Sequence, residues 1–80
     1  SAHAERAAAI ASARSGRIGE IAGRLAERRI RAAHLRTRGG ETMEQEADRL
    51  ELEADALELE LETETDAMER ELERAFADVT

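Results

Sequence analysis

The amino-acid sequence predicts an all-α fold: an antiparallel helical hairpin of two long helices that dimerises into a four-helix bundle. Three observations lead to this fold. The 80 residues contain no proline, and their only pair of adjacent glycines, Gly39-Gly40, divides them into halves. The second half has the apolar periodicity of a helix. The halves are also oppositely charged, since residues 1–40 hold nine arginines and three acidic residues, whereas residues 41–80 hold three arginines and sixteen acidic residues.

The first helix is expected at about residues 3–37, within a single helical-hairpin domain that covers residues 1–80. Its best core candidates are Ile18, Ile21 and Leu25. Three arginines intrude on the same apolar side: Arg14, Arg29 and Arg36. Because an arginine can lay its aliphatic stem on a core and still reach a carboxylate, we expect these three to contact the acidic second helix.

Glycines make the first helix the less regular of the two. Each glycine inside a helix costs about 1 kcal/mol relative to alanine. Small residues recur at spacings of four and three, at Ser12, Gly16, Gly19, Gly23 and Ala26. They form a groove into which a second helix could pack closely, by analogy with small-residue faces in membranes. Alternatively, Ser15-Gly16 breaks the helix and a new one runs from about Arg17 to Thr37. The sequence leaves both open.

The turn is expected at residues 38–41. Glycine is the favoured residue just past the end of a helix, and Arg36 and Arg38 suit the negative end of the helix dipole. Thr42-Met43-Glu44-Gln45 has the pattern of a capping box, which starts a helix. These signals predict a second helix over about residues 42–78.

The second helix has a continuous apolar stripe flanked by glutamates. Its core candidates are Leu50, Leu57, Leu61, Met68, Leu72 and Phe76. The stripe repeats every eleven residues, which favours nearly straight or slightly right-handed packing. Glu58 and Glu64 lie at its edges and are expected to form salt bridges with the first helix. Leu52 and Leu59 lie near the opposite face, either as scattered surface residues or as a second contact seam of a coiled-coil oligomer.

Little in the chain points to chemistry. There is no cysteine, tryptophan or tyrosine, and only one phenylalanine. We expect His3 in a frayed terminus and His34 on the surface. A di-iron Glu-x-x-His pair is absent because Arg31 stands three residues before His34. We therefore expect no enzyme activity, no catalytic residue, no cofactor and no metal. No apolar run approaches the roughly 20 residues that span a bilayer, so we expect no membrane association and a cytoplasmic protein.

The sequence thus favours a structural or protein-interaction module that forms a homodimer and possesses no catalytic site. In overall shape it resembles the small bacterial helical-hairpin proteins, such as plasmid copy-control dimers and secretion cochaperones. It is equally compatible with a designed bundle, and the choice between natural and designed origin stays open.

Two alternative functions use the charged faces. One is nucleic-acid binding through an arginine face of the first helix, formed by Arg17, Arg24, Arg28, Arg31 and Arg38. We do not expect nucleic acid as the partner, because the chain carries a net charge of −7 and an acidic helix lies alongside. The other is an acidic inhibitor or antitoxin-like protein that captures a basic partner with its second helix.

Overall fold

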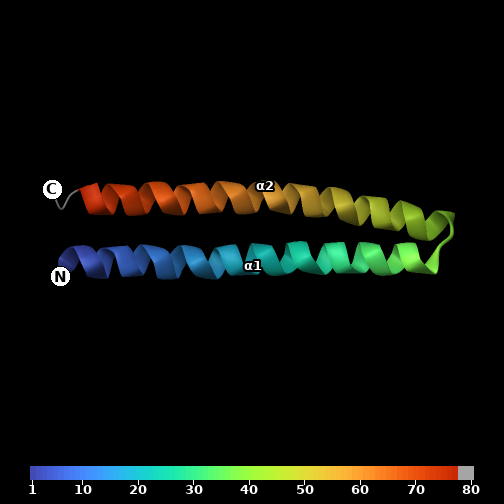
Figure 1. The fold of residues 1–80 in the computed structure, drawn as a ribbon, viewed down its shortest axis with the longest axis horizontal. Helices are drawn as coiled ribbons and strands as arrows, with labels where there is room; N and C mark the ends of the chain where they lie inside the picture. Colours follow the sequence, from blue (N-terminus) through green and yellow to red (C-terminus); the bar gives the residue numbers. More distant parts are fainter. Residues whose placement is uncertain (78–80) are drawn as a thin grey trace.

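The computed structural model describes residues 1–77, which form two antiparallel helices joined by a short turn (Figure 1). Helix α1 runs over Ala2–Arg38 and helix α2 over Glu41–Ala77. The predicted all-α helical hairpin is confirmed. The rod measures 60 × 15 × 12 Å, and its radius of gyration of 18.0 Å exceeds the value of about 12 Å expected for a compact domain of this length.

Helix α1 continues through Ser15-Gly16 without a break, so the alternative of two shorter helices is wrong. Its first turn is capped by Ser1, whose side-chain oxygen accepts a hydrogen bond from the amide of Ala4 at 3.2 Å. At the other end, the Gly39 amide donates to the carbonyl of Leu35 at 3.2 Å. The three internal glycines are thus held within one regular helix.

The turn consists of Gly39 and Gly40, whose φ angles are +74° and +99°. Glycine adopts this region without the steric cost that a Cβ would impose. Because the Gly40 carbonyl already accepts from the Glu44 amide at 3.0 Å, α2 begins at Glu41. Thr42 therefore lies inside the first turn, and the predicted capping box with Thr42 as cap residue is wrong. The last predicted residue of the second helix, Asp78, lies outside the described residues.

The contact between the helices follows a seven-residue repeat. The buried residues of α2 include Ala47, Ala54 and Ala75, which are separated by multiples of seven, with Leu50 in between. The predicted eleven-residue repeat would bring Phe76 to the contact, but Phe76 is 57% exposed and Ala75 only 1%. The contact with α1 repeats every 3.5 residues per turn, whereas the apolar stripe of α2 repeats every 3.67 residues per turn. The two lines therefore diverge along α2 and are furthest apart near its C-terminal end.

The interior of the hairpin is thin, because each helix has a single neighbour. Of the predicted core residues, Ile21 and Leu50 are buried and Phe76 is exposed. The remaining ones are half-buried: Ile18, Leu25, Leu57, Leu61, Met68 and Leu72. The chain exposes 5601 Å², whereas a compact protein of 8.8 kDa exposes about 4,800 Å². The single hairpin therefore exposes more surface to water than a compact protein of its mass does.

Candidate interaction surfaces

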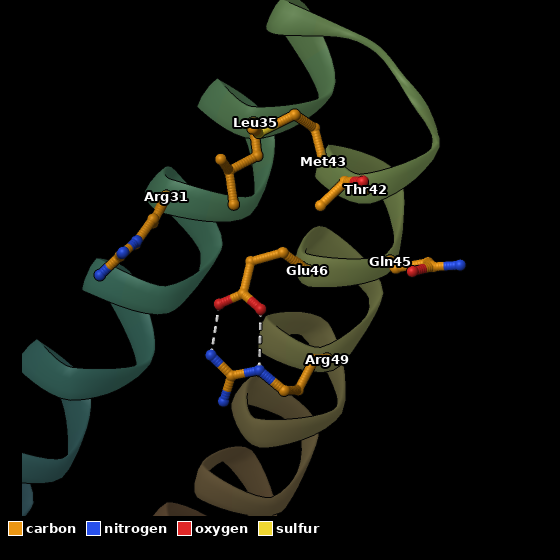
Figure 2. A pocket seen from close by; sticks show the side chains of 7 residues that line it. All are labelled: Arg31, Leu35, Thr42, Met43, Gln45, Glu46 and Arg49. Carbon is orange, nitrogen blue, oxygen red and sulfur yellow. Dashed lines mark hydrogen bonds and ion pairs between the residues drawn. The ribbon is translucent and has the colours of Figure 1, made fainter.

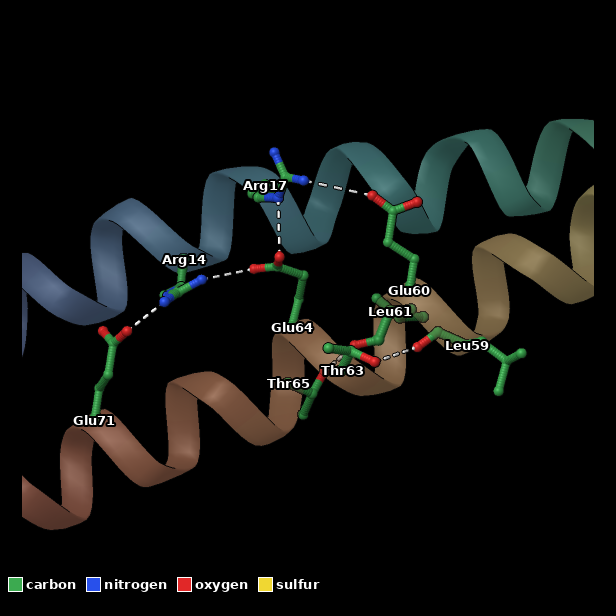
Figure 3. A network of polar contacts seen from close by, with 9 residues as sticks. All are labelled: Arg14, Arg17, Leu59, Glu60, Leu61, Thr63, Glu64, Thr65 and Glu71. Atoms are coloured by element: carbon green, nitrogen blue, oxygen red, sulfur yellow. Dashed lines mark hydrogen bonds and ion pairs between the residues drawn. The ribbon is translucent and has the colours of Figure 1, made fainter.

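Arg14 joins the two helices near their free ends (Figure 3). Its Nη1 donates to Glu64 Oε2 at 2.8 Å, and its Nη2 donates to Glu71. Arg17 approaches the same carboxylate from the neighbouring turn, with Nε 3.1 Å from Glu64 Oε1, and its Nη2 lies 3.5 Å from Glu60 Oε1. The side chain of Glu64 is only 16% exposed. A polar layer thus interrupts the apolar seam.

Glu64 and Glu71 continue the seven-residue series of Leu50 and Leu57, so they occupy positions where the seam would otherwise hold leucine. The hydrogen bond from Arg14 lowers the pKa of the Glu71 carboxyl below its ordinary value, and the same bond raises the pKa of Arg14. Arg14 and Glu64 were predicted to form contacts between the helices, whereas Glu71 was not. The seven-residue spacing from Leu57 was the signal that could have identified it.

Arg29 and Arg36 bind the acidic residues of α2 near the turn. Arg29 Nη2 lies 2.8 Å from Glu58 Oε2 and 3.7 Å from Asp55 Oδ1. Arg36 Nη2 lies 3.0 Å from Asp48 Oδ1, and this hydrogen bond raises the pKa of Arg36.

Both arginines also reach Glu51, Arg29 at 3.4 Å and Arg36 at 3.3 Å. The predicted contacts of Arg14, Arg29 and Arg36 with α2 are confirmed, as are the predicted salt bridges of Glu58 and Glu64.

The predicted arginine face is partly neutralised within the chain. Arg17 is bound by Glu60 and Glu64, and Arg24 pairs with Glu20 one turn away at 2.7 Å. Within residues 1–77 no ion pair is formed by the remaining three members of the face, Arg28, Arg31 and Arg38. Arg28 is half-buried along the seam, and the others are exposed. The structure therefore offers no continuous row of free guanidinium groups.

A hollow of about 520 Å³ lies beside the turn and is open to solvent (Figure 2). It is lined by Arg31, Leu35, Thr42, Met43, Gln45, Glu46 and Arg49. Glu46 is engaged by Arg49, whose Nε donates at 3.0 Å and whose Nη2 donates to the second carboxylate oxygen. This pairing lowers the pKa of the Glu46 carboxyl. Gln45 points away from the hollow (Figure 2). Within the described residues, the Thr42 hydroxyl forms no hydrogen bond with the Glu46 carboxylate.

The part of the chain that the structure describes contains no group of three or more histidine, cysteine, aspartate or glutamate side chains placed to hold a metal ion. His34 is exposed and His3 is half-buried. None of the described helices has the length and apolarity needed to cross a membrane.

The outward faces carry large apolar side chains that the hairpin does not cover. Leu52 is 70% exposed, Leu59 67% and Ile30 71%. Leu59 lies on the side of α2 away from α1 (Figure 3). On the first helix, a Cβ added at Gly16, Gly19 or Gly23 would meet nothing within 4 Å. The small-residue groove is therefore unused within a single chain.

Comparison with known proteins assigns no family to this arrangement. No protein-family model, no curated protein and no solved structure matches the chain.

Proposed function

We propose that the chain is a structural and protein-interaction module that works as a homodimer, in which two coiled-coil hairpins associate into a four-helix bundle. The observation that carries this proposal is the pair of leucines on the far side of α2, Leu52 and Leu59, which are 70% and 67% exposed. They are seven residues apart and so lie along one line of the helix, as the residues of a second packing seam do. A second copy would remove them from water.

The exposed area supports the same proposal. The hairpin exposes 5601 Å², about 800 Å² more than a compact protein of its mass. One partner in a standard protein interface buries about 800 Å². Association of two hairpins would therefore bring the exposed surface per chain to the level of an ordinary globular protein.

The glycines of α1 also gain a role in an assembly. Gly16, Gly19 and Gly23 each weaken the helix by about 1 kcal/mol relative to alanine, and nothing in the single chain approaches them. A helix of a neighbouring copy could approach the α1 backbone closely along this line, which lies on the side of the hairpin opposite Leu52 and Leu59 and would be a contact additional to the leucine seam. Ile30 continues the line by one turn beyond Ala26 and is 71% exposed.

Nucleic-acid binding is not adopted as the function. Arg17 is held by Glu60 and Glu64 of α2, and Arg24 by Glu20 of α1. Phosphates would have to compete with these carboxylates for the guanidinium groups.

The proposed dimer is tested with the double variant Leu52→Gln/Leu59→Gln. Both side chains point away from α1, so the hairpin should keep its helix content by circular dichroism while its mass by light scattering falls from dimer to monomer. The control is Ala9→Gln/Ala13→Gln, which introduces the same side chains at two exposed positions of α1. A double variant that stays dimeric would show that this seam is not the interface.

A further inference from the structure

The apolar stripe of α2 loses its cover in the half of the helix that lies beside the chain termini. There the contact with α1 passes through Glu64, Glu71 and Ala75. The apolar stripe instead passes through the next residue in each case, Thr65, Leu72 and Phe76, which lies about 100° further round the helix. Thr65 and Leu72 are half-buried and Phe76 is 57% exposed. These three residues form what we call the terminal apolar strip.

An acidic ribbon runs along α2 beside this strip. Its members follow one another at spacings of three and four: Asp48, Glu51, Asp55, Glu58, Glu62, Asp66, Glu69 and Glu73. In the half near the turn, Arg29 and Arg36 bind the first four. In the terminal half the last four are exposed, and none of them forms an ion pair within the described residues 1–77. The ribbon is thus neutralised over only half of its length.

The sequence of α1 explains why the neutralisation stops. Arg36 and Arg29 are seven residues apart, and the next positions of the same series are Ala22, Ser15 and Ala8. These side chains are small and uncharged. They therefore form no ion pair with the ribbon, and they leave space beside the terminal apolar strip. A hollow of about 350 Å³ opens there, lined by Glu58, Leu61, Glu62, Thr65 and Asp66. The seven-residue series of α1 that binds the ribbon near the turn therefore has no cation beside the terminal half of the ribbon.

We infer that the terminal half of α2 is a docking surface for a basic amphipathic helix of another protein. The apolar side of that helix would cover the terminal apolar strip, and its arginines or lysines would bind the four unpaired carboxylates of the ribbon. This is helix-in-groove recognition, in which an apolar face supplies contact area and flanking charges fix the register. Arg29 and Arg36 already show how cations at this spacing bind the ribbon.

A second copy of the chain does not supply this helix in a closed dimer. Arg17, from the arginine face, contacts Glu60 on one side of the seam, whereas Arg29 contacts Glu58 on the other side. The arginine face and the acidic ribbon therefore lie on opposite faces of the hairpin. A two-fold dimer joins a surface to the same surface of its partner, so it does not bring the two together. The inference is thus independent of the proposed dimer.

The test uses the full chain and a synthetic helical peptide of about 21 residues, built from three identical heptads that each carry two leucines and one flanking arginine. Fluorescence anisotropy should show binding that weakens as sodium chloride rises from about 50 mM to about 500 mM. A peptide with glutamine in place of each arginine should bind at least about fivefold more weakly. Equal binding of the two peptides, or no binding of the arginine peptide, would overturn the inference.

Matched variants locate the site. Glu62→Gln/Glu69→Gln should weaken binding of the arginine peptide about fivefold. Glu27→Gln/Glu41→Gln also removes two exposed charges that form no ion pair within the described residues 1–77, but both lie outside the terminal half of α2, so binding should be unchanged. Phe76→Ala should weaken binding, whereas Ile30→Ala should not. Equal losses in the two glutamine pairs would show a general charge effect and contradict the inference.

The monomeric Leu52→Gln/Leu59→Gln variant separates this inference from the proposed dimer. It should bind the arginine peptide as the unchanged chain does, because both leucines lie outside the strip. Loss of peptide binding in this variant would contradict an independent site on α2. If the unchanged chain proved to be a monomer and still bound the arginine peptide, the docking surface would be supported and the dimer refuted.

Discussion

Single residues decide how the two helices are matched, and Arg14 is the clearest case. It lies on the apolar side of α1 and binds two carboxylates of α2, at Glu64 and Glu71. Both carboxylates occupy seam positions, so a different alignment of the helices would leave them facing apolar side chains. Burying a charge without a partner is costly. Arg14 therefore favours the observed register of α1 against α2 over registers shifted along the seam.

Replacing Arg14 by alanine should destabilise the hairpin. The change leaves Glu64, only 16% exposed, with Arg17 as its one remaining cation, and it removes the partner of Glu71. We expect the thermal midpoint by circular dichroism to fall by several degrees. Arg24→Ala is the control, because the pair of Arg24 with Glu20 is well exposed and such pairs contribute little. Equal shifts in both variants would refute the role of Arg14.

The same contact gives a pH dependence of defined sign. Arg14 lowers the pKa of Glu71 in the folded chain. A carboxyl with a lowered folded pKa stabilises the fold above its unfolded pKa of about 4.3, and this contribution is lost as the pH falls through the folded value. The drop in thermal midpoint between about pH 7 and about pH 3 should therefore be smaller in Glu71→Gln than in the unchanged chain.

Glu73→Gln is the control for the pH experiment, since Glu73 is exposed and forms no ion pair within the described residues. If Glu73→Gln reduced the acid sensitivity as much as Glu71→Gln does, the contact with Arg14 would not be its source.

At the scale of the helices, the two helix spans could be predicted from the sequence to within one residue at each described end. Gly39-Gly40, the charged ends and the absence of proline were sufficient signals. The start of α2 was displaced by one residue, because Gly40 at a φ of +99° lets the helix begin at Glu41 before the expected cap at Thr42.

The register of the contact could not be predicted from α2 alone. Its leucines suggested an eleven-residue repeat, but winding depends on both helices. The least exposed line of α1 also has spacings of four and three, and it runs through Ala7, Ala11, Arg14, Ile18, Ile21, Leu25, Arg28, Ala32 and Leu35. Because several positions of this line are alanine or arginine, the spacing of large apolar residues alone does not reveal its seven-residue repeat. The contacts of Arg14, Arg29 and Arg36 were predictable, because an arginine on an apolar face beside an acidic helix has an evident partner.

The glycines of α1 allow a prediction at this scale. In the single hairpin, Gly16→Ala/Gly19→Ala/Gly23→Ala should stabilise the helix, by up to about 3 kcal/mol for the three changes together. The Leu52→Gln/Leu59→Gln background supplies the single hairpin, and urea unfolding measures the change. Gly40→Ala is the control and should destabilise, since Gly40 has a φ of +99°. Destabilisation by the three alanines would show that something packs against these glycines even in the monomer.

At the scale of the whole molecule, the net charge of −7 conceals two helices of opposite sign. They neutralise each other towards the turn through Arg29 and Arg36 and towards the termini through Arg14 and Arg17, but the terminal half of the acidic ribbon forms no ion pair within the described residues 1–77. The rod also has outward leucines and exposed glycines that a single hairpin does not use. Leu52 and Leu59 lie in the middle of α2, whereas the ribbon carboxylates without an ion pair in residues 1–77 and the terminal apolar strip lie nearer the chain termini, which suits one surface for a second copy and another for a basic helix.

Sedimentation equilibrium over about 1 to 100 μM tests whether the hairpin is the subunit of a homodimer. We expect a mass close to twice the chain mass of 8.8 kDa, which falls to that of one chain in Leu52→Gln/Leu59→Gln. A chain that remains fully helical by circular dichroism and sediments at 8.8 kDa throughout this range would contradict it.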